Sequence, residues 1–182
     1  MQKRSHKLLA QTLLEGFDGF QKRRFELAFL FGSFQPDCNP FSYLKGSLCA
    51  RKFMGHNFSN SRPYIYHHIL RLQRRTHWTC WQYYTLGKLT HYVADAFTFP
   101  HNDTYPDSLL EHRRYEDELR CQFAQYLSGC NLPHSRSWNN VGDVLDRLHH
   151  QYLSVQSNSL RDARFILAAN CLLMASVLPE VL

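Results

Sequence analysis

The chain reads HYVADAFTFPH at residues 91–101 and HRRYE at residues 112–116. In the first stretch His91 and Asp95 are four residues apart, and the second stretch begins with a histidine and ends with a glutamate at the same spacing. Side chains four apart lie on one face of an α-helix. Each stretch therefore predicts a helix that presents an imidazole beside a carboxylate, and both groups are ligands that suit zinc. The candidate ligands in these stretches are His91, Asp95, His101, His112 and Glu116.

Helical periodicity extends over most of the chain. Apolar residues recur at helical spacing from Leu8 to Phe20, with Ser5 as a candidate cap, and a second helix is expected from about Arg24 to Gly32, before Pro36. Turn-forming residues cluster from Cys38 to Arg62 and predict a long ordered loop. Further helices are expected at about 63–75, 77–97, 107–128, 141–155 and 159–178. No β-period or hairpin signal interrupts this pattern, so the predicted fold class is all-α.

Length and composition favour one domain. A chain of 182 residues, 44% of them hydrophobic, can bury the core of one compact unit, so we expect a single domain over residues 1–182. The formal net charge is +6 at pH 7. A basic surface suits a phosphate-bearing partner, although ordinary solubility would also explain the charge.

Cysteine usage and the N-terminal segment predict a cytoplasmic protein. The 6 cysteines include no C-x-x-C pair and are expected to be free, mostly buried thiols. The segment MQKRSHKLLAQTLLEGF lacks the apolar core and cleavage site of a signal peptide, so the protein would be secreted only as a processed form. The longest apolar stretch, residues 165–178, is too short to cross a membrane, and no transmembrane segment is expected. No obligate protein partner is evident.

The ligand pattern, together with GSFQPD ending at Asp37, resembles the zinc-dependent phospholipase C family. That family shares its fold with the zinc-dependent single-strand nucleases. The resemblance covers roughly residues 6–116. It implies a compact multi-helix domain that hydrolyses phosphate esters with two or three zinc ions at the bottom of a cleft.

The resemblance also implies a set of ligands for each ion. One zinc would be held by Asp37, His56, His91 and Asp95. His67 or His68 could take the place of His56, which lies farther from Asp37 along the chain than expected.

The resemblance implies separate ligand sets for the remaining two ions. Asp95 would bridge to a second zinc that also takes His6 and the amine and carbonyl of Met1, whose amine would have to be free. The third zinc would be held by His101, His112 and Glu116.

The same likeness suggests how the reaction would proceed. Water activated by the metal cluster would attack phosphorus, with Asp37 as the catalytic group that orients or deprotonates it. Arg113 and Arg114 lie between two ligands and are candidate contacts for substrate phosphate. Phe58 is a candidate substrate contact among aromatic residues that would meet a lipid surface or stack on a base. The other residues of this aromatic group are Phe31, Phe34, Phe41, Tyr43 and Phe53.

Three functions follow from these expectations. The first is a phospholipase C-like zinc hydrolase that acts on a phospholipid head group and makes peripheral contact with a lipid surface. The second is a zinc-dependent nuclease or nucleotidase, which the basic charge would suit. The third is a metal-binding or membrane-surface scaffold without turnover.

Overall fold

A computed structural model describes residues 1–38, 58–102, 105, 109–132 and 140–179. Within these ranges the chain is helical and contains no strand, which confirms the all-α prediction. The helices are α1 (Lys3–Gly16), α2 (Arg23–Cys38), α3 (Phe58–Gln73), α4 (Cys80–Ala96), the short 3-10 helix η2 (Phe99–His101), α5 (Leu109–Ser128), α6 (Val141–Ser154) and α7 (Ser159–Val177). None of the described helices is long and apolar enough to cross a membrane.

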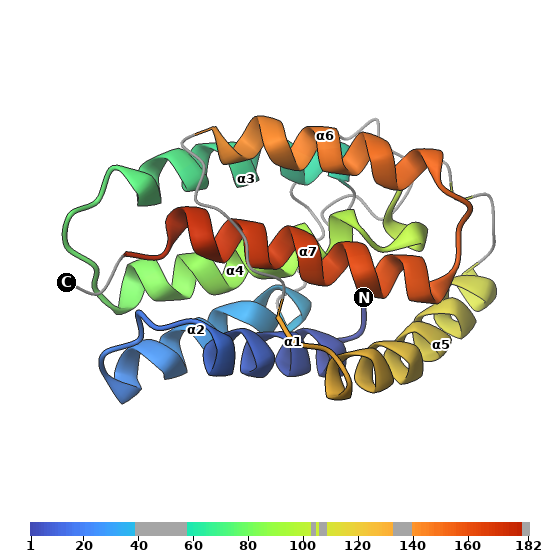
Figure 1. Ribbon diagram of the computed structural model, residues 1–182, viewed down its shortest axis with the longest axis horizontal. Helices are drawn as coiled ribbons and strands as arrows, with labels where there is room; N and C mark the ends of the chain where they lie inside the picture. Colours follow the sequence, from blue (N-terminus) through green and yellow to red (C-terminus); the bar gives the residue numbers. More distant parts are fainter. Residues whose placement is uncertain (39–57, 103–104, 106–108, 133–139, 180–182) are drawn as a thin grey trace.

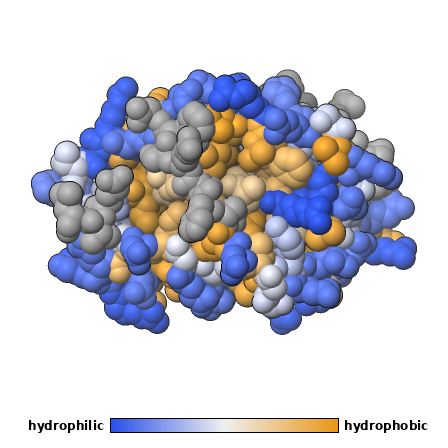
Figure 2. All heavy atoms as spheres, viewed as in Figure 1, coloured by the Kyte–Doolittle hydropathy of each residue, from blue (hydrophilic) through white to orange (hydrophobic). Residues whose placement is uncertain are grey.

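The helices form tiers around α4 and α7 (Figure 1). In this view α3 and α6 lie above the central pair, and α1, α2 and α5 lie below it. Helix α4 contacts α1, α2, α3 and α7, and nearly all of its side chains from Tyr83 to Ala96 are buried. On the face seen in Figure 2, apolar residues show in the middle and hydrophilic residues surround them.

A capping box fixes the start of α4. The Thr79 hydroxyl accepts a hydrogen bond from the backbone N–H of Trp81, and the backbone N–H of Thr79 donates to the Gln82 side chain at 2.9 Å. These bonds satisfy donors that a helix end otherwise leaves without partners. The helix therefore begins at Cys80, three residues after the expected start at His77.

Helices α2 and α4 approach closely because glycine faces glycine. A Cβ atom on Gly87 would meet the carbonyl of Phe29 and the amide of Ser33, and a Cβ atom on Gly32 would meet the carbonyl of Tyr84. This close contact brings the backbone of Ser33 within reach of His91 on α4.

Other expected helix ends were also wrong. Helix α2 does not stop before Pro36 but continues to Cys38, so Asp37 lies on a helix rather than on a turn. Pro36 lies in the last turn, where the missing N–H and the proline ring disturb little of the helix. Helix α3 begins at Phe58, ahead of Pro63, and Ser5 is buried within α1, whose cap residue is Gln2.

Most of the other helices agree closely with expectation. The observed α6 and α7 each end one residue before the predicted boundary. Most of the loop expected between Cys38 and Arg62, and residues 107 and 108 at the expected start of α5, lie outside the described residues. The described cysteines are free, as expected, but only Cys171 is buried, so the expectation of mostly buried thiols was wrong.

Candidate metal centre

Two groups of ligand-type side chains meet where α1, α2, α4, η2 and α5 come together. In each group the candidate ligand atoms lie within 4.8 Å of one another. Cluster A consists of His6, His91 and Asp95, and cluster B consists of His101, His112 and Glu116. The structure thus brings together six of the side chains that the sequence singled out.

Cluster A centres on the buried carboxylate of Asp95. One carboxylate oxygen lies 3.2 Å from Nε2 of His6, and the other lies 3.2 Å from Nε2 of His91. Asp37, at the end of α2, extends the cluster: its oxygens lie 3.6 Å from Nε2 of His91 and 4.0 Å from Nε2 of His6. Four side chains from three helices therefore converge.

The backbone of α2 orients His91. Nδ1 of His91 lies 2.9 Å from the carbonyl oxygen of Ser33, which can only accept a hydrogen bond. Nδ1 therefore carries a proton, and Nε2, which faces Asp37 and Asp95, is the nitrogen left to bind a metal. A ring nitrogen held in this way by a carbonyl is the usual arrangement of a metal-binding histidine.

His6 has a lowered pKa, and its ring nitrogens lack hydrogen-bond partners. Burial, and then the neighbouring His91, lower its pKa to about 4, so its ring offers a lone pair at neutral pH. Both ring nitrogens of His6 and Oδ2 of Asp37 are buried without a hydrogen-bond partner. Buried polar atoms are nearly always paired. A cation between Nε2 of His6 and Oδ2 of Asp37, which lie 4.0 Å apart, would satisfy these two atoms, and the mixture of imidazole and carboxylate fits zinc.

Cluster B is built on η2 and the first half of α5. Nε2 of His101 lies 3.2 Å from Oε1 of Glu116, and Nε2 of His112 lies 3.3 Å from the same oxygen. Both histidines are buried, and Glu116 is largely so. The helical spacing of His112 and Glu116 produces this convergence, as the sequence predicts.

The N-terminal amine of Met1 joins the two clusters. Its nitrogen lies 2.8 Å from Oδ1 of Asp95, 2.9 Å from Oε1 of Glu116 and 2.8 Å from Nε2 of His101. Burial lowers the pKa of this amine, but the two carboxylates outweigh it and raise the pKa to about 11. Burial also disfavours the charge of Asp95, yet the Met1 amine and the surrounding imidazoles hold its pKa well below the ordinary value.

The other histidines considered as ligands do not join these clusters. His56 lies outside the described residues. His67 is exposed, and His68 is half-buried with its ring 4.2 Å from that of Tyr64. Neither belongs to cluster A or cluster B.

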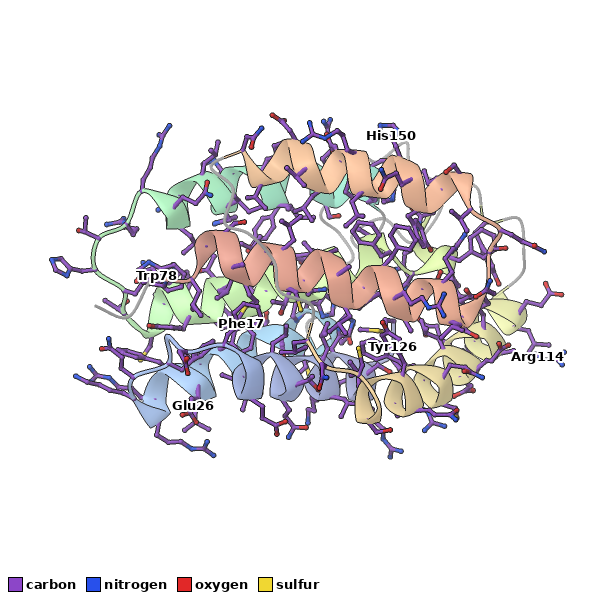
Figure 3. The ribbon with its side chains drawn as sticks, viewed as in Figure 1. Phe17, Glu26, Trp78, Arg114, Tyr126 and His150 are labelled. Atoms are coloured by element: carbon purple, nitrogen blue, oxygen red, sulfur yellow. The ribbon has the colours of Figure 1, made fainter. Side chains whose placement is uncertain are left out.

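The candidate substrate contacts are Arg113, Arg114 and Phe58. Arg113 and Arg114 are exposed, and Arg114 points away from the helices (Figure 3). Phe58 packs on His149, with ring centroids 3.9 Å apart. The structure does not bring these three side chains into contact with a cluster residue.

Asp162, which the sequence analysis did not identify, holds η2 in place through hydrogen bonds. Its Oδ2 accepts hydrogen bonds from the backbone N–H of Phe99 at 2.8 Å and from the hydroxyl of Tyr115 at 2.9 Å. Its Oδ1 accepts from the hydroxyl of Tyr152 at 2.9 Å and from Arg161 at 2.8 Å. Asp162 thereby ties the turn that carries His101 to α5, α6 and α7. In the sequence it reads as an ordinary acidic residue in the first turn of a helix.

His149 supports the same turn from α6. Its Nε2 lies 2.9 Å from Oδ1 of Asn102 and 3.1 Å from the carbonyl oxygen of Ala96, so it donates to one or both. Asn102 in turn donates to the carbonyl oxygens of Ala96 and Thr98. The sequence analysis did not single out His149, because nothing in its spacing relates it to His101.

Comparison with known proteins agrees with the geometry of the clusters. A family model described as zinc dependent phospholipase C matches residues 5–159, which include every residue of both clusters and Asp37. The match extends well beyond the expected limit near residue 116. No curated protein and no solved structure matches the chain. The length of the family match shows that the chain belongs to the zinc-dependent phospholipase C family.

Proposed function

We propose that residues 1–182 form a single catalytic domain that hydrolyses phosphate esters, in the manner of a phospholipase C, at a centre of two or three zinc ions. The observation that supports this most directly is the convergence of clusters A and B on the Met1 amine. The Met1 amine contacts residues of both clusters, so ions bound at cluster A and cluster B would be close enough to act on one phosphate.

The proposed ligands follow the two clusters. Asp37, His91, Asp95 and the undescribed His56 would hold one ion, and Asp95 would be shared with a second ion that also takes His6 and Met1. Cluster B would hold the third. The buried nitrogens of His6 and the buried Oδ2 of Asp37, which lack hydrogen-bond partners, support the assignment to cluster A.

The metal would supply charge for the phosphate oxygens and a lower pKa for an attacking water. The protein would supply the geometry. Asp37 is less buried than Asp95, with a side chain 16% exposed against 1%, so of the two acids it lies nearer to water from solvent. Asp37 would accept a hydrogen bond from that water and hold it in line with phosphorus. Ser33 and Asp162 would keep His91 and His101 in place.

A substrate panel tests the proposal. Protein with a free N-terminus and added zinc would be assayed on a water-soluble phosphodiester, on phosphatidylcholine in micelles, and on single-stranded DNA. We expect hydrolysis of the soluble phosphodiester and of the lipid. Hydrolysis of DNA alone would favour the nuclease alternative, and hydrolysis of none, with zinc bound, would favour the scaffold.

A further inference from the structure

A continuous aromatic surface lies on the outer side of α2 and α4. The ring of Phe31 stacks on that of Tyr84 at 5.8 Å, and Trp81 lies 5.3 Å from Tyr84 on the other side. Phe34 extends the surface toward α1, with its ring 5.6 Å from that of Phe31. Leu27 lies one helical turn before Phe31. We call Leu27, Phe31, Phe34, Trp81 and Tyr84 the aromatic face.

The aromatic face is unusually open to solvent. Leu27 is 51% exposed, Phe31 53% and Trp81 67%. A single exposed apolar side chain needs no explanation, but a contiguous set of large ones usually marks a surface that binds something. Two of the aromatic residues expected from the sequence to meet a lipid surface, Phe31 and Phe34, belong to this face.

Lysine side chains surround the aromatic face. Nζ of Lys7 lies 4.4 Å and Nζ of Lys3 lies 5.2 Å from the ring centre of Phe34. Nζ of Lys88 lies 5.7 Å from the ring centre of Tyr84. These ammonium groups lie over the rings of Phe34 and Tyr84, so positive charge lies directly against the aromatic face.

Negative charge is scarce on the same helices. Apart from Lys88, the only charged residue of α4 is Asp95, which is buried in cluster A. On α2, Glu26 pairs with Arg23 at 2.5 Å, and Asp37 faces His6 and His91 beside cluster A. Lys3 and Lys7 therefore place positive charge against exposed aromatic rings, and this combination selects the class of partner.

We propose that the aromatic face docks the protein on an anionic lipid bilayer. Aromatic rings settle at the level of the head groups, and lysines around them are attracted to anionic lipids. The face also leads to the candidate centre, because Phe34 lies one turn before Asp37 and Lys3 donates a hydrogen bond to Sγ of Cys38 at 2.9 Å. Docking through this face places the end of α2 near the head groups. The inference rests on the proposed function only in that the bound surface would also supply the substrate.

Vesicle binding tests the docking directly. The zinc-loaded protein would be sedimented with vesicles of phosphatidylglycerol and phosphatidylcholine in equal amounts, and with vesicles of phosphatidylcholine alone. We expect binding to the anionic vesicles, a weaker affinity as salt is raised, and a blue shift of tryptophan emission that Trp81→Phe reduces. Little or no binding to anionic vesicles would overturn the inference.

Substitutions on the face locate the binding. Phe31→Ser combined with Trp81→Ser should weaken binding to anionic vesicles by about tenfold or more, since both rings lose their contact with the interface. Lys7→Gln with Lys88→Gln should remove the preference for anionic vesicles. Leu153→Ser, which changes a side chain 40% exposed on α6, is the matched control and should bind as the wild type does. Equal binding by the serine pair and the control would contradict the proposal.

Parallel assays separate this inference from the proposed function. Each variant would be checked for folding by circular dichroism, with Trp81→Ser alone replacing the pair if the pair does not fold. Hydrolysis of a water-soluble phosphodiester would be measured on the same samples and should be unchanged. Activity without vesicle binding would overturn the docking alone, whereas vesicle binding without any hydrolysis would overturn the proposed function alone.

Discussion

His6 and His91 lie face to face, with ring centroids 3.8 Å apart and an angle of 18° between the ring planes. One residue comes from α1 and the other from α4, and both rings are fully buried beside the single carboxylate of Asp95. Because the Nε2 atoms of both rings lie 3.2 Å from the carboxylate of Asp95, a cation beside this carboxylate would be within reach of both imidazoles. The predictions below test that interpretation.

Asp95→Asn should remove both activity and more than one equivalent of zinc. Among the residues that the structure describes, Asp95 is the one side chain that contacts His6, His91 and the Met1 amine. An amide keeps the shape but loses the negative charge and one acceptor. Zinc content by mass spectrometry and hydrolysis of a soluble phosphodiester check the outcome. Asp143→Asn, on an exposed position of α6, is the control; an Asp95→Asn protein with full zinc and activity would disprove the shared role.

Gly87→Ala should loosen cluster A without touching a ligand. A Cβ atom there would overlap the carbonyl of Phe29 and press on the amide of Ser33, so α2 has to move away from α4. Such overpacking costs about 1–3 kcal/mol of the free energy of unfolding. Because Ser33 orients His91, zinc affinity should fall as well.

The matched control for this change is Gly129→Ala, since a Cβ atom on Gly129 meets nothing within 4 Å. Thermal unfolding and zinc titration of the two variants would be compared. If both variants unfolded at the wild-type temperature and bound zinc equally, the close contact of α2 and α4 would have no role in the centre.

Blocking the N-terminal amine should weaken the centre. Met1 is 4% exposed, and its amine contacts Asp95, His101 and Glu116, so an added tag or an acetyl group removes the charge and needs space that the fold does not provide. We expect less zinc, lower activity and a lower unfolding temperature than in protein tagged at the C-terminus. Equal values for the two proteins would show that the amine is not needed.

Asp162→Ala should destabilise the protein and loosen cluster B. The side chain is fully buried and accepts from Arg161, Tyr115, Tyr152 and the backbone of η2, so its loss leaves a buried arginine without its carboxylate. Breaking a buried ion pair in this way typically costs about 3–5 kcal/mol.

Tyr115→Phe is the milder companion of that variant. It removes one hydrogen bond between α5 and Asp162, for which a loss of about 1 kcal/mol is expected. The absorption spectrum of bound cobalt reports the geometry of cluster B in both variants. A wild-type spectrum in both would mean that Asp162 supports the fold but not the position of His101.

The helices and most of cluster B could be predicted from local spacing. His112 and Glu116 are one turn apart on a single helix, so helical geometry alone brings them together. The same reasoning applies to His91 and Asp95. In both pairs the four-residue spacing on one helix brings the side chains together, and the structure confirms it.

Other features depend on contacts that no local rule describes. Asp37 reaches His91 because α2 continues through Pro36 and because Gly32 and Gly87 let two helices touch. Asp162 and His149 act on η2 from α7 and α6, far away in the chain. The exposure of Phe31 and Trp81 is also a tertiary result, since aromatic residues are more often buried.

Zinc content is the measurement that tests the account most directly. Protein with a free N-terminus would be purified without chelator and analysed by mass spectrometry for bound metals. The convergence of clusters A and B predicts two or three equivalents of zinc for each chain. One equivalent or none would contradict a shared multi-zinc centre.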